Sequence, residues 1–193
     1  MSCRIYMDHA ATTEMLPEVR EAMEPYLREE YGNASTSYEM GVRMHDVLED
    51  ARAKIARVID AQPEEIFFTS GGSESDNWVI KNVAGEKKHI GKHIITTKIE
   101  HHAILRSCQY LESLGYEVTY LDVDDYGLVR AEDVANALRD DTTLVSVMTG
   151  NNEIGTIEPI AEIGAFLRTK GVAFHTDAVQ AVGQIDRKST RLN

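Results

Sequence analysis

The chain has 193 residues, of which 42% are hydrophobic and 27% are charged, so it is long enough for one domain with a buried core. Its formal net charge of −12 argues against nucleic-acid binding, which requires clustered basic residues. There is no run of about 18 apolar residues for a membrane span, no secretory signal after Met1, and the two cysteines make no disulfide framework. We therefore expect a cytoplasmic protein that binds neither nucleic acid nor membrane.

Amphipathic helical segments alternate along the chain with short apolar, β-rich runs. One helix is expected from Pro17 to about Glu30, because proline is favoured in a first turn, and another from Met44, where apolar residues recur at helical spacing. The expected strands are 66–69, 93–97, 118–121, 144–148 and 172–175. The helices expected between them are about 74–84, 103–114, 131–139 and 160–169. This alternation predicts a single α/β domain, a mainly parallel sheet with helices on both faces.

Ligands of open α/β sheets bind at the carboxyl ends of the strands, so the residues after each expected strand are the candidates for a site. After Thr69, Gly71 and Gly72 let the backbone approach a ligand, and Ser73 with Asp76 resembles a capping box. A helix that begins here would offer unpaired N–H groups to a phosphate. An ordinary strand-to-helix turn is the alternative, and the segment is neither a Walker A loop nor a Gly-x-Gly-x-x-Gly pattern.

Two further strand ends carry polar side chains. His101 and His102 follow the second strand, but no third ligand is spaced to complete a metal site with them, so no metal is expected. Asn151 and Asn152 follow the fourth strand and suit a turn, although a side-chain amide there can hydrogen-bond a ligand. His93 lies beside a glycine-containing turn and is expected to be exposed to solvent.

Asp177 stands at the end of the last expected strand, with His175 on the same face and Gln180 three residues further on. A carboxylate on an apolar strand needs a cationic partner when it is buried. A protonated pyridine nitrogen would be such a partner. An aspartate that caps the next helix is an equally good local interpretation.

Six motifs, in this order and at these spacings, resemble those of the NifS-like cysteine desulfurases. They are Asp8-His9-Ala10-Ala11-Thr12-Thr13, Gly32-Asn33-Ala34-Ser35, Thr69-Ser70-Gly71-Gly72-Ser73-Glu74-Ser75-Asp76-Asn77, Glu100-His101-His102, Asn151-Asn152-Glu153-Ile154-Gly155 and His175-Thr176-Asp177-Ala178-Val179-Gln180. The resemblance implies the fold-type I architecture of the class V aminotransferases, which use pyridoxal 5′-phosphate (PLP). Residues 1–186 would form an incomplete PLP-binding large domain, and residues 187–193 a tail foreign to the family.

The resemblance also implies roles for the matching residues. Gly72 and Ser73 would bind the PLP phosphate, in agreement with the helix N-terminus inferred above. His101 would stack on the pyridine ring and move protons during the reaction. These residues are expected to converge at one edge of the sheet with three others. Of those three, Asn152 would lie near the ring oxygen, and Asp177 would pair with the pyridinium nitrogen and keep the ring an electron sink.

The sixth residue, Gln180, would hydrogen-bond the ring hydroxyl. The implied reaction converts L-cysteine to L-alanine and passes the sulfur to an enzyme cysteine as a persulfide. Iron–sulfur scaffold proteins or tRNA-thiolation partners would then accept it from an enzyme that is a homodimer. Other expectations remain open: a selenocysteine lyase or another class V PLP enzyme, or a non-catalytic fragment. A dinucleotide-binding domain is disfavoured because no strand is followed by Gly-x-Gly-x-x-Gly.

Two groups that this reaction needs are not found in the sequence. The lysine that holds PLP is expected in a Ser-x-His-Lys stretch after Asp186, and the sulfur-accepting cysteine further downstream. Cys108 falls in the middle of an expected helix and is interpreted as a buried structural thiol, whereas Cys3 matches nothing. We therefore expect the 193-residue chain to be inactive by itself.

Overall fold

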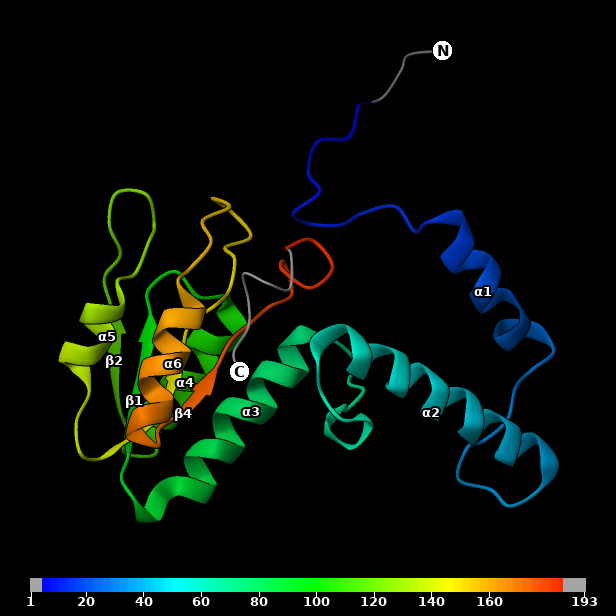
Figure 1. Cartoon of the computed structure of the whole chain (residues 1–193), viewed down its shortest axis with the longest axis horizontal. Helices are drawn as coiled ribbons and strands as arrows, with labels where there is room; N and C mark the ends of the chain where they lie inside the picture. Colours follow the sequence, from blue (N-terminus) through cyan, green and yellow to red (C-terminus); the bar gives the residue numbers. More distant parts are fainter. Residues whose placement is uncertain (1–4, 186–193) are drawn as a thin grey trace. The chain divides into compact units, whose positions relative to one another are not determined.

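The computed structural model describes residues 5–185, which fall into two compact units divided between Phe68 and Thr69 (Figure 1). The first unit contains α1 (Pro17–Arg28), α2 (Glu39–Ile59) and the short 3-10 helix η1 (Pro63–Glu65). The second contains α3 (Gly72–Glu86), the 3-10 helix η2 (Lys87–His89), β1 (His93–Thr97), α4 (His102–Ser113), β2 (Glu117–Leu121), α5 (Ala131–Ala137), β3 (Thr142–Ser146), α6 (Ile160–Lys170) and β4 (Ala173–His175). The tail expected at residues 187–193 lies outside the described residues.

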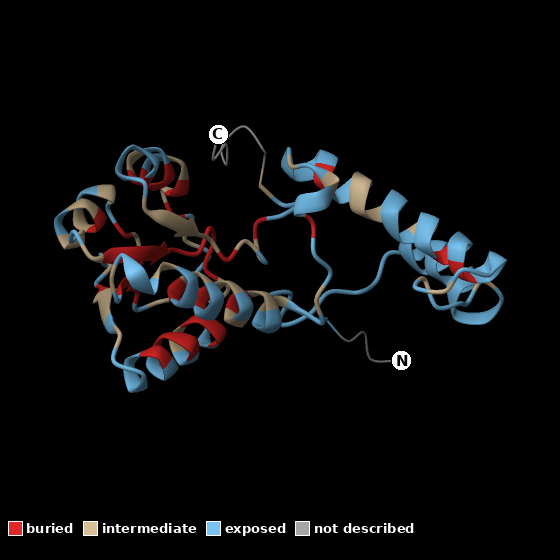
Figure 2. Ribbon diagram, turned by 90° about the horizontal axis from the view of Figure 1, so that it is seen from below, coloured by how far each residue is buried: buried red, intermediate tan, exposed pale blue. Residues whose placement is uncertain are grey.

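The first unit is built from two amphipathic helices that bury few of their side chains (Figure 2). Pro17 occupies the first turn of α1, as expected, whereas α2 begins at Glu39, earlier than the sequence pattern predicted. Gly41 is buried in the first turn of α2. A Cβ atom at this position would lie 2.0 Å from Thr36 Oγ1, so only glycine lets the preceding loop pack this closely.

The second unit is organised around a four-stranded sheet of order β2-β1-β3-β4, in which every described pairing is parallel. In its central register, Ile94 of β1 aligns with Val118 of β2 and with Leu144 of β3. The mainly parallel sheet expected from the alternation of strands and helices is therefore confirmed.

The strand expected at residues 66–69 is wrong. This segment joins no sheet among the described residues, and its two aromatic side chains are exposed, Phe67 by 64% and Phe68 by 48%. The carbonyl of Ile66 accepts a hydrogen bond from the guanidinium of Arg52 instead of from a neighbouring strand. An apolar run alone did not distinguish a paired strand from an extended connection.

Both faces of the sheet are covered by helices, because alternate residues of each strand face opposite sides. Ile95 and Val145 point into one core cluster, which α5 and α6 complete with side chains such as Ile163. Ile94 and Leu144 point into the other, which α3 and α4 complete. The buried strands lie between exposed helix surfaces in Figure 2, and the expected covering of both faces is confirmed.

His93 is fully buried, so the expectation that it is exposed is wrong. Strand β1 begins at this residue, and the imidazole lies between the neighbouring strands. Its Nδ1 is 2.7 Å from Thr142 Oγ1 and its Nε2 is 2.8 Å from Thr119 Oγ1. Burial lowers the pKa of His93, and the positive charge of the nearby Arg139 lowers it further.

The chain leaves the adjacent strands β1 and β3 toward opposite faces. The helix after β1 is α4, which packs in one core cluster, and the helix after β3 is α6, which packs in the other. In such a sheet, ligands bind where the connections diverge, outside the carboxyl ends of the strands. No helix among residues 5–185 combines the length and apolarity needed to cross a bilayer.

Candidate functional site

The N-terminus of α3 presents unpaired amides. The carbonyl of Gly71 accepts from Glu74 N at 3.1 Å and from Ser75 N at 3.2 Å. Among residues 5–185, no acceptor lies at hydrogen-bond distance from the amides of Gly72 and Ser73, and Ser73 is exposed. These N–H groups and the helix dipole suit an anionic group such as a phosphate.

The capping box expected between Ser73 and Asp76 does not form, because α3 has no side-chain cap. The carboxylate of Glu74 instead accepts from Ser70 N at 2.6 Å and from Ser70 Oγ at 2.7 Å. These bonds lower the pKa of Glu74, the backbone one most. Asp76 is thereby free of a capping role and turns inward.

Asp76, His101 and Asp177 come together in space although they are far apart in the sequence. One ligand atom of each lies within 4.8 Å of the others. They come from α3, from the N-cap of α4 and from the segment after β4. The residues Asp76 and Asp177 are only 4% and 8% exposed, whereas His101 is exposed. The atoms lie close enough to surround a single cation. The sequence predicted that His101 and Asp177 lie at the same edge of the sheet, but it did not predict that Asp76 joins them.

A signal for Asp76 was present in the sequence. Asp76, Ile80 and Ala84 are the buried residues of α3, and a spacing of four places them on one helix face. A carboxylate on an otherwise apolar stripe needs a partner in the interior.

The carboxylates of this cluster are poorly balanced by protein cations. Burial and, secondly, the charge of Asp177 raise the pKa of Asp76 to about 7. His175 Nε2 lies 3.7 Å from Asp76 Oδ1, but burial lowers the pKa of His175 to about 4, so this imidazole is neutral at pH 7. The other ring nitrogen, Nδ1, is 2.9 Å from Ser146 Oγ. The cluster therefore favours a bound cation from outside the chain.

Asp177 also organises the loop after β4. Its Oδ1 accepts from Val179 N at 2.9 Å, and its carbonyl accepts from Thr149 N at 2.8 Å. The interpretation of Asp177 as the cap of a following helix is wrong, because no helix follows β4 among the described residues and its carboxylate closes a turn instead. Its pairing with a ring nitrogen stays a prediction. A Cβ built on Gly72 would lie 2.9 Å from Val179 Cγ2, which places the N-terminus of α3 next to this turn.

His101 is held by the helix that it caps. Its Nδ1 accepts from Ala103 N at 3.2 Å. A neutral imidazole that accepts through Nδ1 carries its hydrogen on Nε2. The Nε2–H group is then the donor that His101 can offer to a ligand.

Glu100 directly precedes His101 in the chain and was noted in the sequence only as part of a motif. Its Oε1 accepts from Thr97 Oγ1 at 2.9 Å and from Met148 N at 2.9 Å, which ties the end of β1 to the segment after β3. Its Oε2 has no hydrogen-bond partner within the described part of the chain. Burial raises the pKa of Glu100 to about 8 despite the two bonds.

The remaining expected site residues lie on loops at the same edge. Asn152 is partly buried, and its amide donates to Glu153 Oε1 at 2.8 Å. Its neighbour Asn151 has a structural role, because its Nδ2 donates to Ile99 O at 2.9 Å and its Oδ1 accepts from two amides of the loop. Gln180 is partly buried in the turns after β4.

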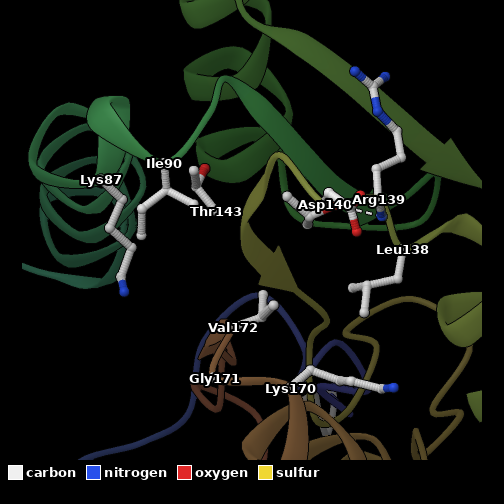
Figure 3. Close-up of a pocket in the computed structure, with 10 residues that line it drawn as sticks. Lys87, Ile90, Leu138, Arg139, Asp140, Thr143, Lys170, Gly171 and Val172 are labelled. Carbon is white, nitrogen blue, oxygen red and sulfur yellow. Dashed lines mark hydrogen bonds between the residues drawn. The ribbon is translucent and has the colours of Figure 1, made fainter.

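A cavity of about 350 Å³ opens at the opposite, amino edge of the sheet (Figure 3). It is lined by three cationic side chains, Lys87, Arg139 and Lys170, among apolar and polar neighbours. Their charged ends point away from one another in Figure 3, and Arg139 is paired with Glu117 and Asp141. The cavity therefore lacks convergent charges and is not the candidate site.

Comparisons with known proteins identify the family of this chain. The model of the aminotransferase class-V family matches residues 5–193. The chain belongs to this family. A cysteine desulfurase IscS of Clostridium botulinum is 53% identical over 96% of this chain and 47% of its own length. The chain thus spans about half the length of the curated relatives it matches.

Two solved structures share the fold of this class V chain. A NifS-like protein aligns with a TM-score of 0.90 and 41% identity over 93% of this chain and 50% of its own. A structure described as SspA in complex with cysteine aligns with a TM-score of 0.88 and 39% identity over 91% of this chain and 51% of its own. The expected fold-type I architecture is confirmed.

Class V aminotransferases depend on PLP, and two features of this chain fit that cofactor. The amides of Gly72 and Ser73, which have no acceptor among the described residues, suit its phosphate. The poorly balanced carboxylates of Asp76 and Asp177 suit its cationic ring nitrogen.

Proposed function

We propose that this chain contributes the PLP-binding half of a cysteine desulfurase that converts L-cysteine to L-alanine. One observation carries the proposal. The N-terminus of α3, with its unpaired amides, lies next to the turn that holds the buried carboxylate of Asp177, and the two segments approach each other at Gly72 and Val179. A phosphate site beside a cation site is what the two ends of PLP require. The relatives called cysteine desulfurases, and a solved relative described as complexed with cysteine, support the substrate.

Each end of the cofactor has its own residues in this proposal. The amides of Gly72 and Ser73 bind the phosphate, and the carboxylate of Asp177 pairs with the ring nitrogen and keeps it protonated. Asn152, on the loop after β3, lies near the ring oxygen, and Gln180, on the loop after β4, hydrogen-bonds the ring hydroxyl. When bound, PLP supplies an electron sink for bond cleavage in the substrate.

His101 lies over the ring in this proposal and moves a proton through Nε2. Because Nδ1 accepts from the Ala103 amide, the neutral ring donates from Nε2. To accept a proton there instead, the ring must shift its hydrogen to Nδ1 and release that amide. The helix cap therefore favours the donor state of His101 before substrate binds.

Cys108 is not the residue that accepts the sulfur. Its thiol is fully buried in the core between α3, α4 and the sheet. Burial raises the pKa of Cys108 to about 12, so the thiolate needed for attack does not form. The proposal assigns the persulfide to a cysteine elsewhere in the whole protein.

The whole protein is proposed to be a cytoplasmic homodimer that passes its sulfur to an iron–sulfur scaffold or to a tRNA-thiolation partner. Large apolar side chains exposed on α1 and α2 support a partner surface in the first unit. They include Met23, Leu27, Leu48, Ile55 and Val58.

The proposal is tested in a chimera that joins residues 1–185 to the remaining part of the Clostridium botulinum relative. It is expected to release alanine from L-cysteine, whereas the 193-residue chain releases none. Asp177→Asn in the chimera should lower turnover roughly 10–100-fold, the value of one charge-assisted hydrogen bond. Asp125→Asn removes the same charge from an exposed loop and should leave turnover unchanged.

A chimera that folds and binds PLP but releases no alanine would contradict the proposed activity. Equal turnover in the Asp177→Asn and Asp125→Asn chimeras would contradict the role of Asp177.

A further inference from the structure

Asp76 is a buried carboxylate for which the family-derived roles have no use. It lies on the inward face of α3, within its second turn, and is 4% exposed. The carboxylate lies within 4.8 Å of the nearest ligand atoms of Asp177 and His101. Its contact with His175 is 3.7 Å long, beyond hydrogen-bond distance. Within residues 5–185, no hydrogen bond to the Asp76 carboxylate therefore offsets the cost of burying it.

We propose that Asp76 is a second carboxylate of the cation-binding site, which acts with Asp177 to attract the positively charged ring nitrogen of the cofactor. The inference rests on the proposed function, because the cation in question is that of PLP. Asp177 makes the direct contact. Asp76, on the neighbouring helix α3, raises the affinity for the cofactor through its negative charge.

Titratable side chains from three neighbouring segments of the chain face Asp76. From β4 comes His175, which is neutral at pH 7 because burial lowers its pKa to about 4. From the segment after β4 comes Asp177, and from the N-cap of α4 comes His101. Glu100, which precedes that cap, holds its proton at pH 7 because burial raises its pKa to about 8.

A coupling between Asp76 and the cofactor follows from these charges. Burial and the charge of Asp177 raise the pKa of Asp76 to about 7, so its carboxylate is protonated at pH 5.5 and ionised at pH 8.5. Only the ionised form attracts a cation. By linkage, the bound cation raises the acid dissociation constant of Asp76 by the same factor that ionised Asp76 contributes to affinity, so a tenfold gain in affinity lowers the pKa of Asp76 by about one unit.

The test measures binding of pyridoxamine 5′-phosphate to the 193-residue chain by equilibrium dialysis, with EDTA present to exclude metal ions. This probe keeps the ring nitrogen and the phosphate but has no aldehyde to react with surface lysines. The Kd of Asp76→Asn divided by that of the unaltered chain is expected to be near one at pH 5.5 and about tenfold at pH 8.5. Taking the ratio cancels the titration of the probe itself.

Two controls separate charge from structure. Asp125→Asn, which removes an exposed charge, should leave the Kd unchanged at both pH values. A carbocyclic analogue, with a C–H group in place of the ring nitrogen, should bind Asp76→Asn and the unaltered chain equally well at pH 8.5. A purely structural effect of the substitution would weaken both probes alike.

The outcomes distinguish this inference from the proposed function. If the unaltered chain binds no probe at any pH, both are overturned. If it binds but the ratio does not change with pH, or is the same for the carbocyclic analogue, only the role of Asp76 is overturned.

The unaltered chain provides a second measurement should Asp76→Asn fail to fold. The carboxyl carbon of Asp76, followed by ¹³C NMR, should titrate at a pH at least one unit lower with the probe bound. An unchanged midpoint would overturn the proposed role.

Discussion

Glu100 joins the two strand ends from which the chain departs to opposite faces of the sheet. Its Oε1 binds Thr97 Oγ1 and the amide of Met148, while its Oε2 has no hydrogen-bond partner among the described residues. A buried carboxyl group in this position costs least when it is protonated. Its role is to hold the loop that carries His101, and the charge itself adds nothing to that role.

The stability of Glu100→Gln tests this interpretation. The raised pKa of Glu100 means that the folded chain keeps a proton that the unfolded chain loses between about pH 4.5 and pH 8, so the unaltered chain loses stability as the pH rises through this window. Glutamine keeps the acceptor and cannot ionise. The free energy of unfolding, measured in urea by circular dichroism, should be higher for the variant than for the unaltered chain by roughly 1–4 kcal/mol at pH 9. At pH 4 the two free energies should be nearly equal.

Glu100→Ala is the matched control, because it leaves the Met148 amide and the Thr97 hydroxyl without their acceptor. It should be less stable than the unaltered chain at pH 4. A glutamine variant that gains no stability at pH 9 would show that the ionised form of Glu100 is well accommodated.

The site residues differ in how far the sequence revealed them. Asp177 was predicted because it ends an apolar strand, where a carboxylate stands out. Glu100 was not singled out, because it lies among polar neighbours and is buried only when β3 brings Met148 over it. Asp76 was given a capping role, although its spacing with Ile80 placed it on the buried stripe of α3. These predictions used only the neighbouring residues in the sequence, whereas the burial of Glu100 and Asp76 depends on tertiary packing.

At the scale of elements, α4 carries His101 at its start and a buried thiol in its middle. Cys108 is fully buried with Ile104 and Leu111 against the sheet. In a Cys3→Ser background, where Cys108 is the remaining thiol, a water-soluble thiol reagent should not react with the folded chain within minutes. When the chain is unfolded in about 8 M urea, the Cys108 thiol should react completely with the reagent.

Rapid labelling of Cys108 without denaturant would contradict the packing of α4 on the sheet. It would also reopen the question of whether this thiol takes part in sulfur transfer. A chain that carries both Cys3→Ser and Cys108→Ser provides the background of the assay.

Elements with strong periodicity were predicted well, and the extended segment before α3 was not. The helices α3 to α6 and the four strands lie within a few residues of their expected positions. Residues 66–69 have the composition of a strand, but strand pairing depends on a neighbour that local sequence does not specify. The failure matters little for the site, because the N-terminus of α3 begins where the pattern of Gly71 and Gly72 placed it.

At the scale of the whole molecule, the sheet of the second unit has two chemically different edges. The carboxyl edge carries the buried carboxylates Asp76, Glu100 and Asp177 beside the amides of α3. The amino edge carries the cavity lined by Lys87 and Lys170, whose charged ends diverge (Figure 3). The cationic side chains of the amino edge can attract an anionic cofactor, but only the carboxyl edge offers partners for both its phosphate and its ring nitrogen.

The central claim is therefore that the cofactor binds at the carboxyl edge, between the N-terminus of α3 and the turn at Asp177. The most direct measurement is a ¹H–¹⁵N correlation NMR titration of the 193-residue chain with pyridoxamine 5′-phosphate. The amide signals of Gly72, Ser73 and Val179 should shift together along one saturable binding curve. Shifts confined to the amino edge, around Lys87 and Lys170, or no saturable shifts at all, would contradict the account.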